Sequence, residues 1–380
     1  MNSVKFKNFI TLQRGFDLPK NKRHYGKYPV IASTSIDDYH NIYKVSPPGV
    51  VTGRSGSLGS VQYIKDKFWP LNTTLWVKDF KKNIPKYVYY KLKTLHLEKY
   101  NSGVGVPTLN RNHLDELKVS IHNHNNQIKI SNILSNYDDY IENNLKRIKT
   151  LETIARNLYQ EWFVNFRFPG YKDVKLKKTN FGKIPENCEI NQLSNQCDLI
   201  KEKYVERVHQ NYPLLDLGRF PRKTMLIDKT GKADEIVSSR IIFNEDDILF
   251  GSIRPYLHKV VIAPCEGVTN TSVHVIRIKN KKFRSLLPII LSSEETINWT
   301  EQYSTGLKMP IISWKNFRKM PIVIPNQKLL NDFDEIVWPI IEYLKLVYKI
   351  NNKLADIREI LANELISGKL DVSKLQTSID

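Results

Sequence analysis

One stretch of this sequence is present twice. Tyr100-Asn-Ser-Gly-Val-Gly-Val-Pro107 returns 203 residues later as Tyr303-Ser-Thr-Gly-Leu-Lys-Met-Pro310. Each copy runs into an apolar alternation and then into a long helical pattern, and the offset of 203 residues persists to Ile121 and Ile324. A constant offset of this length in a chain of 380 residues predicts one structural unit in two copies.

Three further landmarks keep the same order in both halves, and over all four landmarks the offset varies between 184 and 203 residues. Loops of different length explain this drift, because loops tolerate insertions better than the elements they connect. The landmarks are Tyr28-Pro-Val-Ile-Ala and Tyr212-Pro-Leu-Leu-Asp, Gly49-Val-Val-Thr-Gly53 and Asp247-Ile-Leu-Phe-Gly251, and Asn72-Thr-Thr-Leu-Trp-Val77 and Asn270-Thr-Ser-Val-His-Val275.

Short strands dominate the pattern ahead of each helical segment. Pro85 is expected to open one helix among them, because its fixed φ suits a first helical turn. The mixture predicts α+β globules. Strands with β-branched or aromatic residues between Gly, Pro and Asn are expected at Gly49-Val-Val-Thr, Ser60-Val-Gln-Tyr-Ile, Thr73-Thr-Leu-Trp-Val and Lys118-Val-Ser-Ile.

Two segments carry apolar residues at steps of three or four, which is the period of a helix. A helix of about 35 residues is roughly 50 Å long, and an apolar stripe of that length needs a partner. We expect the two helices to pair as an antiparallel coiled coil; the alternative is that each packs only on its own globule. Pro339 is expected in the first turn of the second helix. The stripes are Ile130, Leu134, Tyr137, Ile141, Leu145, Ile148, Leu151, Ala155, Leu158 and Trp162, and Ile336, Ile340, Leu344, Val347, Ile350, Leu354, Ile357, Leu361 and Leu365.

The net charge of +19 is concentrated in two blocks. Residues 1–125 carry 20 Lys and Arg against 8 Asp and Glu, and residues 171–325 carry 25 against 17. Two basic globules on nearly neutral helices predict two contacts with one polyanion, of which long DNA is the simplest. An anionic membrane is a weaker candidate, because no helix is both strongly basic and amphipathic. The chain lacks a membrane-length apolar run, a secretory signal and metal-spaced cysteines, so a reduced, cytoplasmic protein is expected.

No catalytic motif is evident in the sequence. The only Pro-Pro is Pro47-Pro48, so the Asn/Asp-Pro-Pro-aromatic motif of DNA amino-methyltransferases is missing. Asp173-Val-Lys175 and His122-Asn-His124 lack the context of nuclease motifs, and Gly53-Arg-Ser-Gly56 lacks the Gly-Lys-Ser/Thr ending of a phosphate loop. No catalytic residue, metal ligand or cofactor is therefore predicted, and the duplication favours two reading units over one active site.

Candidate DNA-binding residues lie at the repeated turns. Lys and Arg bind phosphates without regard to sequence, whereas Arg, Asn, Ser and Thr also present donors and acceptors to base edges. For each residue, a structural role in a turn or strand remains the alternative. The candidates are Thr52, Arg54, Ser55, Ser57, Asn72, Thr73, Thr74, Arg111, Arg254, Tyr256, His258, Lys259, Asn270, Thr271, Ser272 and Lys308.

The order of these features resembles the specificity subunits of type I restriction-modification systems. In both repeats, Ser/Thr-Gly-x-x-x-Pro precedes an apolar strand, an Asn-Gln pair (Asn126-Gln127 and Asn326-Gln327) and a long helix. Cys188 replaces the tryptophan that is usual in the family's linker, and the N-terminus lacks a matching Ile-Pro-Glu lead-in. Further matches are Glu161-Trp-Phe-Val-Asn-Phe-Arg-Phe-Pro169, Gly182-Lys-Ile-Pro-Glu-Asn-Cys-Glu189 and Leu365-Ile-Ser-Gly-Lys-Leu-Asp371.

The resemblance implies two target recognition domains in tandem, related by an internal pseudo-two-fold repeat, each reading one half of a split double-stranded DNA site. It implies a first domain at residues 1–122, a central spacer helix at 123–168, a linker and second domain at 169–325, and a C-terminal spacer helix at 326–380. The helices would dock two methyltransferase subunits, and restriction subunits would join them. Catalysis and its cofactors would belong to those partners. Interface candidates are Ile141, Leu145, Ile148, Leu158, Trp162, Leu344, Val347, Leu354, Leu361 and Leu365.

Two other functions remain open at this point. The first is a nuclease or methyltransferase with a degenerate site, which would cut or methylate DNA without added subunits. The second is a scaffold that binds nucleic acid through basic globules and shows no preference among duplex sequences.

Overall fold

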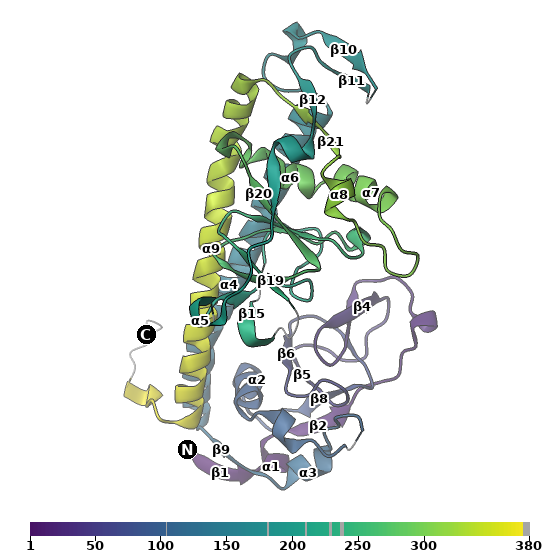
Figure 1. The fold of residues 1–380 in the computed structure, drawn as a ribbon. Coiled ribbons are helices and arrows are strands. Elements are labelled where there is room, and N and C mark those ends of the chain that lie inside the picture. Colours follow the sequence, from purple (N-terminus) through teal and green to yellow (C-terminus); the bar gives the residue numbers. More distant parts are fainter. Residues whose placement is uncertain (104, 181, 210, 228–229, 236–238, 375–380) are drawn as a thin grey trace. The chain divides into compact units, whose positions relative to one another are not determined.

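The structure is a computed structural model of the 380-residue chain, and it describes residues 1–374 except 104, 181, 210, 228–229 and 236–238. The chain divides into two compact units (Figure 1). Unit 1 comprises Met1–Ile141 and Leu354–Asp380, and unit 2 comprises Glu142–Lys353. Two long helices, α4 (His124–Tyr159) and α9 (Gln327–Ser367), each contribute one segment to each unit.

Unit 1 contains an antiparallel four-stranded sheet and a smaller three-stranded sheet. The first has the order β2-β8-β5-β6, with β2 (Thr11–Arg14), β8 (Thr74–Asp79), β5 (Gly49–Gly53) and β6 (Val61–Ile64). In the second, β3 (Tyr28–Ile31) lies antiparallel to β4 (Ile36–His40) and parallel to β7 (Trp69–Pro70). A separate pair joins β1 (Asn2–Lys5) to β9 (Lys118–Ile121). The strands predicted in this half are confirmed.

The core of unit 1 includes one end of the long-helix pair. Phe6 of α1 (Phe6–Phe9) and Tyr87 of α2 (Pro85–Thr94) belong to one buried cluster with Leu134 of α4 and Leu365 of α9. Residues near the start of α4 thus pack together with residues near the end of α9, so the helices run antiparallel here. Helix α2 begins at Pro85, as predicted.

The strand order is repeated in unit 2. Its first sheet is β13-β20-β17-β18, formed by β13 (Cys197–Ile200), β20 (Val273–Ile278), β17 (Ile248–Gly251) and β18 (Val260–Ile262). Its second sheet is β15-β14-β19-β16, formed by β15 (Gly231–Lys232), β14 (Pro213–Leu214), β19 (Gly267–Asn270) and β16 (Arg240–Phe243). Strand β14 is parallel to β19, as β3 is to β7 in unit 1. The predicted duplication is confirmed in both strand order and strand direction.

Further elements of unit 2 surround these sheets. The pair of β12 (Glu189–Gln192) and β21 (Pro321–Ile324) corresponds to that of β1 and β9, while the hairpin of β10 (Leu176–Thr179) and β11 (Gly182–Pro185) lies between α4 and β12 in the chain. The short helices are α5 (Glu206–His209), α6 (Leu286–Leu291), α7 (Glu294–Gln302) and α8 (Trp314–Phe317).

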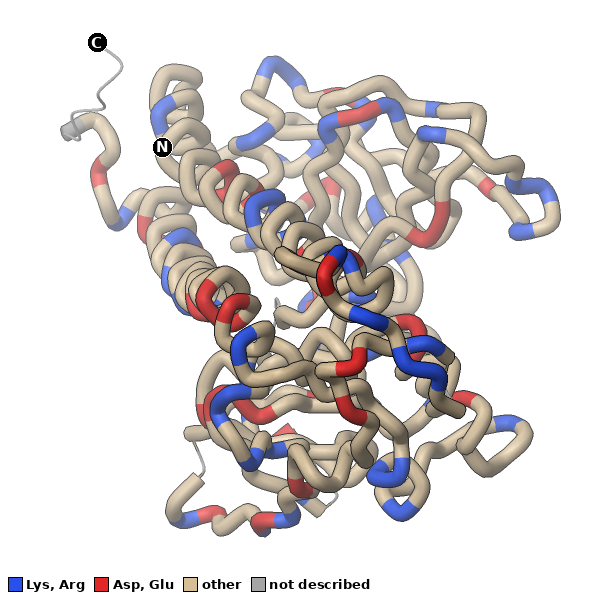
Figure 2. Tube along the Cα trace, turned by 90° about the horizontal axis from the view of Figure 1, so that it is seen from above, with Lys and Arg blue, Asp and Glu red and all other residues tan. Residues whose placement is uncertain are grey.

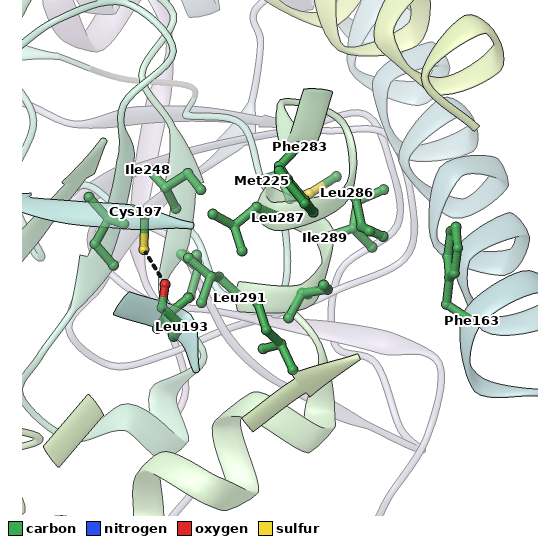
Figure 3. Close-up of a cluster of buried hydrophobic side chains, with 14 of the residues drawn as sticks. Phe163, Leu193, Cys197, Met225, Ile248, Phe283, Leu286, Leu287, Ile289 and Leu291 are labelled. Atoms are coloured by element: carbon green, nitrogen blue, oxygen red, sulfur yellow. Dashed lines mark hydrogen bonds between the residues drawn. The ribbon is translucent and has the colours of Figure 1, made fainter. Parts of the chain in front are cut away.

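The main core of unit 2 joins α6 and the first sheet to both long helices. Figure 3 shows part of this cluster, with Cys197 and Ile248 from the first sheet and Leu286 and Leu287 from α6. A π-helical turn at Gln160–Val164 follows α4, and the consecutive Trp162 and Phe163 in it are both buried. The Phe163 ring meets that of Phe333 edge-on at 4.9 Å. Because Phe333 lies near the start of α9, the helices are antiparallel in this unit as well.

The antiparallel pairing predicted for the two helices is therefore confirmed within each unit. The alternative that each helix packs only on its own globule is wrong, because the last turns of α9 belong to the core of unit 1. The expectation for Pro339 is also wrong. Helix α9 begins at Gln327, so Pro339 lies inside the helix, where it removes one backbone hydrogen bond.

Candidate nucleic-acid interface

Three separate segments meet at the end of β5 in unit 1. The Arg54 N–H donates to the Thr73 carbonyl (2.8 Å), which joins the Gly-rich loop to the turn before β8. The Gly56 N–H donates to the Pro107 carbonyl (2.9 Å), and the Leu109 N–H donates to the Arg54 carbonyl (2.8 Å). We call residues 54–56, 72–73 and 105–109 the loop framework of unit 1.

The same contacts recur in unit 2. The Ser252 N–H donates to the Ser272 carbonyl (2.9 Å), the Arg254 N–H to the Pro310 carbonyl (2.7 Å), and the Ile312 N–H to the Ser252 carbonyl (2.9 Å). Each bond has a counterpart in unit 1, so residues 252–254, 271–272 and 308–312 form the loop framework of unit 2. The repeated Gly-x-x-x-Pro segment is part of both frameworks.

Glycine is required at the start of this segment in both units. A Cβ at Gly103 would lie 2.0 Å from the Val106 carbonyl oxygen. Gly306 has a φ of +99°, and its Cβ would lie 2.8 Å from the Met309 carbonyl oxygen. Side chains are disfavoured at such positions, so the repeated glycine serves the backbone and leaves recognition to its neighbours.

The strand register corrects the letter-by-letter alignment of the repeats. Val51 pairs with Trp76 in unit 1, and Leu249 pairs with Val275 in unit 2. Trp76 therefore corresponds to Val275, at an offset of 199 residues, and not to His274. By the same offset Asn72 corresponds to Thr271, so its alignment with Asn270 is wrong by one residue. A shift of one residue in a strand exchanges its two faces.

Most of the predicted DNA-binding residues lie on or beside the two loop frameworks, and they differ in exposure. Among them, Tyr256 has 50% of its surface exposed, and the Arg54 guanidinium donates only to the Asn72 carbonyl (3.3 Å). The exposed candidates are Ser57, Arg111, Arg254, Tyr256, Thr271 and Lys308, and the half-buried ones are Arg54, Ser55, Asn72 and Thr73.

Three predicted residues are buried and bound to backbone. The Thr52 hydroxyl donates to the Ser60 carbonyl (2.9 Å), and the Thr74 hydroxyl donates to the Leu71 carbonyl (2.7 Å). His258 Nε2 lies 2.7 Å from the Ser292 carbonyl, and burial lowers the pKa of its imidazole. These side chains stabilise the framework from within and do not face solvent.

The remaining three candidates in unit 2 are half-buried and already engaged. The Lys259 ammonium donates to the Leu217 carbonyl, and burial lowers its pKa. The Asn270 side chain accepts from the Ser272 N–H at 3.0 Å, which fixes the turn before β20.

A cavity of about 340 Å³ opens beside the loop framework of unit 1. Its walls include Arg54 and Arg111, which are predicted DNA-binding residues. Arg14, Asn110 and Asn112 also line it and were not predicted from the sequence. Arg14 ends β2 and reaches the loops only through the pairing of β2 with β8, so no local motif identifies it. The remaining lining residues are Leu75, Ser102, Thr108 and Leu109.

Comparison with known proteins agrees with this duplicated architecture. Residues 1–153 match the family described as "Type I restriction modification DNA specificity domain". The chain is 25% identical over 362 residues to the type I restriction enzyme MjaIX specificity subunit of Methanocaldococcus jannaschii, with 87% of this chain and 80% of that protein covered. It is 22% identical over 311 residues to the MjaVIII specificity subunit of the same organism, with coverage of 76% and 71%. The chain is a relative of the type I restriction specificity subunits.

The fold of this specificity-subunit relative is also found in a solved structure. The S subunit of a type I restriction-modification system from M. genitalium superposes with a TM-score of 0.58 at 18% identity, covering 96% of this chain and 95% of that one. The similarity extends over both repeats and both long helices.

The two long helices correspond residue by residue at an offset of 203. Leu134 and Val337 are both fully buried. Trp162 and Leu365, which correspond in the same way, are also buried, with exposed fractions of 7% and 0%. Within unit 2 the Asn144 amide donates to the Asn351 side chain (2.7 Å), and within unit 1 Arg358 forms an ion pair with Asp138.

The predicted interface residues on these helices differ in exposure. Leu145 differs from the other members of the set, because 44% of its surface is exposed and it lines a cavity of unit 2. The buried members are Ile148, Trp162, Leu344, Val347 and Leu365, and the half-buried ones are Ile141, Leu158, Leu354 and Leu361.

The described residues offer no metal-binding cluster. Outside the gaps in the description, no group of three or more His, Cys, Asp or Glu side chains is arranged to hold a metal ion. Burial raises the pKa of the Cys197 thiol to about 12 and that of Cys265 to about 11, so neither is an activated nucleophile. Among the described helices, none combines the length and apolar character that a membrane crossing needs.

Proposed function

We propose that this chain is the sequence-specific DNA-binding subunit of a type I restriction-modification complex, with one half of a split duplex site read by each unit. The duplicated loop framework carries this proposal: the same backbone hydrogen bonds hold it in both units, whereas the side chains that it exposes differ. Like frameworks suit equivalent contacts with a regular duplex, and unlike side chains suit different base sequences.

Positive charge supports DNA as the ligand. Figure 2 shows basic residues at many loops of the trace, and the net charge of the chain is +19. Lys and Arg supply the sequence-independent part of DNA affinity by displacing counterions from phosphates. In this proposal residues 1–122 and 169–325 hold the two readers, and residues 123–168 and 326–380 hold the spacer helices. A genomic DNA partner places the protein in the cytoplasm.

The long helices offer matched positions for two copies of one partner. Tyr140 and Tyr343 correspond by the 203-residue offset and are 66% and 38% exposed. Ile154 and Ile357 correspond in the same way and are 48% and 44% exposed. Exposed apolar residues that recur at equivalent positions favour protein contacts, so we assign them to two methyltransferase subunits.

Catalysis in this proposal belongs to the partners. The methyltransferase subunits would transfer methyl groups, and restriction subunits in the full complex would cleave DNA. In this proposal the chain itself supplies sequence recognition.

Selection from random duplexes tests the function. The full chain, assembled with its methyltransferase subunits, should enrich a consensus of two short half-sites separated by a fixed, nonspecific spacer. Methylation mapping in the host genome should return the same motif on both strands. Enrichment of no motif would favour the nonspecific scaffold, and cutting or methylation by the chain alone would favour the degenerate enzyme.

A further inference from the structure

The cavity in unit 1 gathers three arginines and no carboxylate. Arg14, Arg54 and Arg111 line its volume of about 340 Å³ together with Asn110 and Asn112. Guanidinium groups are never deprotonated in proteins, so all three charges persist at any physiological pH. The polar walls and the charge suit a ligand that offers hydrogen-bond acceptors.

The charge of this cavity is not neutralised from within. The side chains of Arg14 and Arg111 form no hydrogen bond or ion pair with any residue that the structure describes, and the Arg54 guanidinium donates only to the Asn72 carbonyl. Elsewhere arginines are held by carboxylates, as Arg277 is by Asp247 (2.7 Å) and Arg284 is by Asp334 (2.7 Å). Like charges that converge without a counterion repel one another, and an acceptor-rich ligand relieves that repulsion.

Strand pairing shows which residues occupy the same place in unit 2. Gln13 pairs with Trp76, and Ile200 pairs with Val275, the residue that corresponds to Trp76. Arg14 therefore corresponds to Lys201, and a positive charge is present in both units. Arg54 corresponds to Ser252, since their N–H groups make equivalent bonds to Thr73 and Ser272.

Arg111, the third arginine of the cavity, corresponds to an aromatic residue in unit 2. Helices α3 (Arg111–Asp115) and α8 are equivalent, because Asn110 and Ser313 cap them with their side chains and lie 203 residues apart. Arg111 thus matches Trp314. The Trp314 ring packs against the rings of His274 (6.1 Å) and Phe317 (6.0 Å), so apolar surface takes the place of a charged group in unit 2.

In a duplicated DNA-binding protein, residues that are alike in the two units and residues that differ are expected to contact different parts of the DNA. Phosphates are the same in every half-site, so a residue that contacts them is expected to keep its charge in both units. Base edges differ between half-sites, so residues that read them are expected to differ. Arg14 and Lys201 follow the first pattern, whereas Arg54 and Arg111 follow the second.

We propose that Arg54 and Arg111 read the acceptor edge of a guanine in the half-site of unit 1, and that Arg14 holds a neighbouring phosphate, as Lys201 does in unit 2. This inference rests on the function proposed above. Arginine matches the O6 and N7 acceptors of guanine with two parallel donors, which is the commonest specific contact to a base. Asn110 and Asn112 supply further donors and acceptors at the cavity wall.

The test uses the full chain assembled with its methyltransferase subunits and a random duplex library. Arg54→Ala and Arg111→Ala should each relax one guanine in one half-site, with discrimination at that position falling about 5- to 150-fold. The other half-site should stay unchanged. Arg111→Lys keeps the charge but loses the planar fork, so it should lower the guanine preference without altering the salt dependence of binding.

Arg14→Ala and Lys201→Ala are the matched pair. Each should weaken binding to all sequences alike and reduce the slope of log K against log salt by about 0.9, the value for one lost phosphate contact. Thermal unfolding of the Arg14 and Arg111 variants should match that of the parent chain, since neither side chain forms a hydrogen bond or ion pair with a described residue.

The outcomes separate this inference from the proposed function. If the parent chain selects a split motif but the Arg54 and Arg111 variants keep every base preference, the guanine assignment is wrong and the function stands. Uniform weakening by Arg54→Ala and Arg111→Ala would make them phosphate contacts and also overturn the assignment. If the parent chain selects no motif, the proposed function fails and this inference fails with it.

Discussion

Units 1 and 2 share a backbone and differ in what they present on it. Both have a four-stranded sheet of the same order, a parallel pair in the second sheet, and a Gly-x-x-x-Pro segment that accepts a hydrogen bond from the loop after the central strand. At that loop, Arg54 and Arg111 line one cavity in unit 1, whereas unit 2 has Ser252 and Trp314 at the corresponding positions. In the proposed function, the shared residues would position each unit on DNA and the differing residues would give it a base preference.

A second difference lies away from the loop framework. The segment between β14 and β17 is longer than its counterpart in unit 1. It adds β16 to the second sheet, whereas β15 pairs with β14 as β4 pairs with β3. The offset between the repeats grows from 184 to 198 residues across this insertion without disturbing the first sheet. This insertion is thus confined to loops and a sheet edge, which tolerate added residues better than the central strands do.

The largest expected effect comes from exchanging one reader. Replacing residues 1–122 with the corresponding domain of another specificity subunit should replace one half of the DNA site and leave the other half and the spacer unchanged. Specific sites are typically bound about 10³- to 10⁷-fold more tightly than nonspecific DNA, so the original half-site should lose most of that advantage. Methylation mapping measures this. A change in both half-sites would show that the units do not read independently.

A core substitution at equivalent helix positions should give the next largest effect. Phe333 and Ile130 correspond by the 203-residue offset and are both almost fully buried, the first in unit 2 and the second in unit 1. Phe333→Ala should lower the free energy of unfolding by about 3–5 kcal/mol and Ile130→Ala by about 2–5 kcal/mol, because each leaves a cavity.

Limited proteolysis and hydrogen exchange should localise the two losses. Loss of protection after Phe333→Ala is expected in unit 2, and after Ile130→Ala in unit 1. Ile360→Ala on the exposed face of α9 is the control, since its side chain is 63% exposed and its substitution should change stability by less than about 0.5 kcal/mol. Equal loss of protection in both units from either core variant would contradict separate cores.

Local patterns identified the elements but not their tertiary roles. The repeat, the strands at Gly49 and Lys118, and the long helices followed from periodicity and spacing, which depend on neighbours in the chain. Thr52 and Thr74 were predicted as contacts and are buried, because alternation along a strand does not say which face packs inward. The role of Arg14 depends on its pairing across β8, and the shift that aligns Asn72 with Thr271 depends on sheet register. Both depend on pairing between residues that are far apart in the sequence.

Matched changes on the helices probe whether the two partner surfaces are equivalent. Ile154 and Ile357 are about half exposed and lie at equivalent positions, one in each unit. Ile154→Glu and Ile357→Glu should each weaken the binding of one methyltransferase subunit by about 1–2 kcal/mol, because a charge would be buried at an apolar contact.

Mass measurement of the complex should show one bound methyltransferase subunit for each single variant at limiting concentration, and little binding for the double variant. Tyr140→Ala and Tyr343→Ala should have weaker effects of the same kind. Retention of both subunits by the double variant would remove these helix positions from the interface. Stability of the free chain should change little, because both isoleucines face solvent.

The smallest expected effect is a loss of stability of unit 2 in acid. Burial lowers the pKa of His258 in unit 2 below its ordinary value of 6.5, although the Ser292 carbonyl and Glu294 partly oppose this. Below pH 6.5 the unfolded chain therefore binds a proton that the folded chain does not, and the stability of unit 2 should fall as pH decreases from that value. Arg156 and Lys223 also face this histidine, and their charges favour its neutral form.

His258→Gln keeps a donor for the Ser292 carbonyl but removes the titration, so it should flatten the loss of hydrogen-exchange protection in β17 and β18 between pH 7 and pH 5. His113→Gln, at an exposed position in unit 1, is the control, and an unchanged pH profile after His258→Gln would assign the acid sensitivity of unit 2 to other groups.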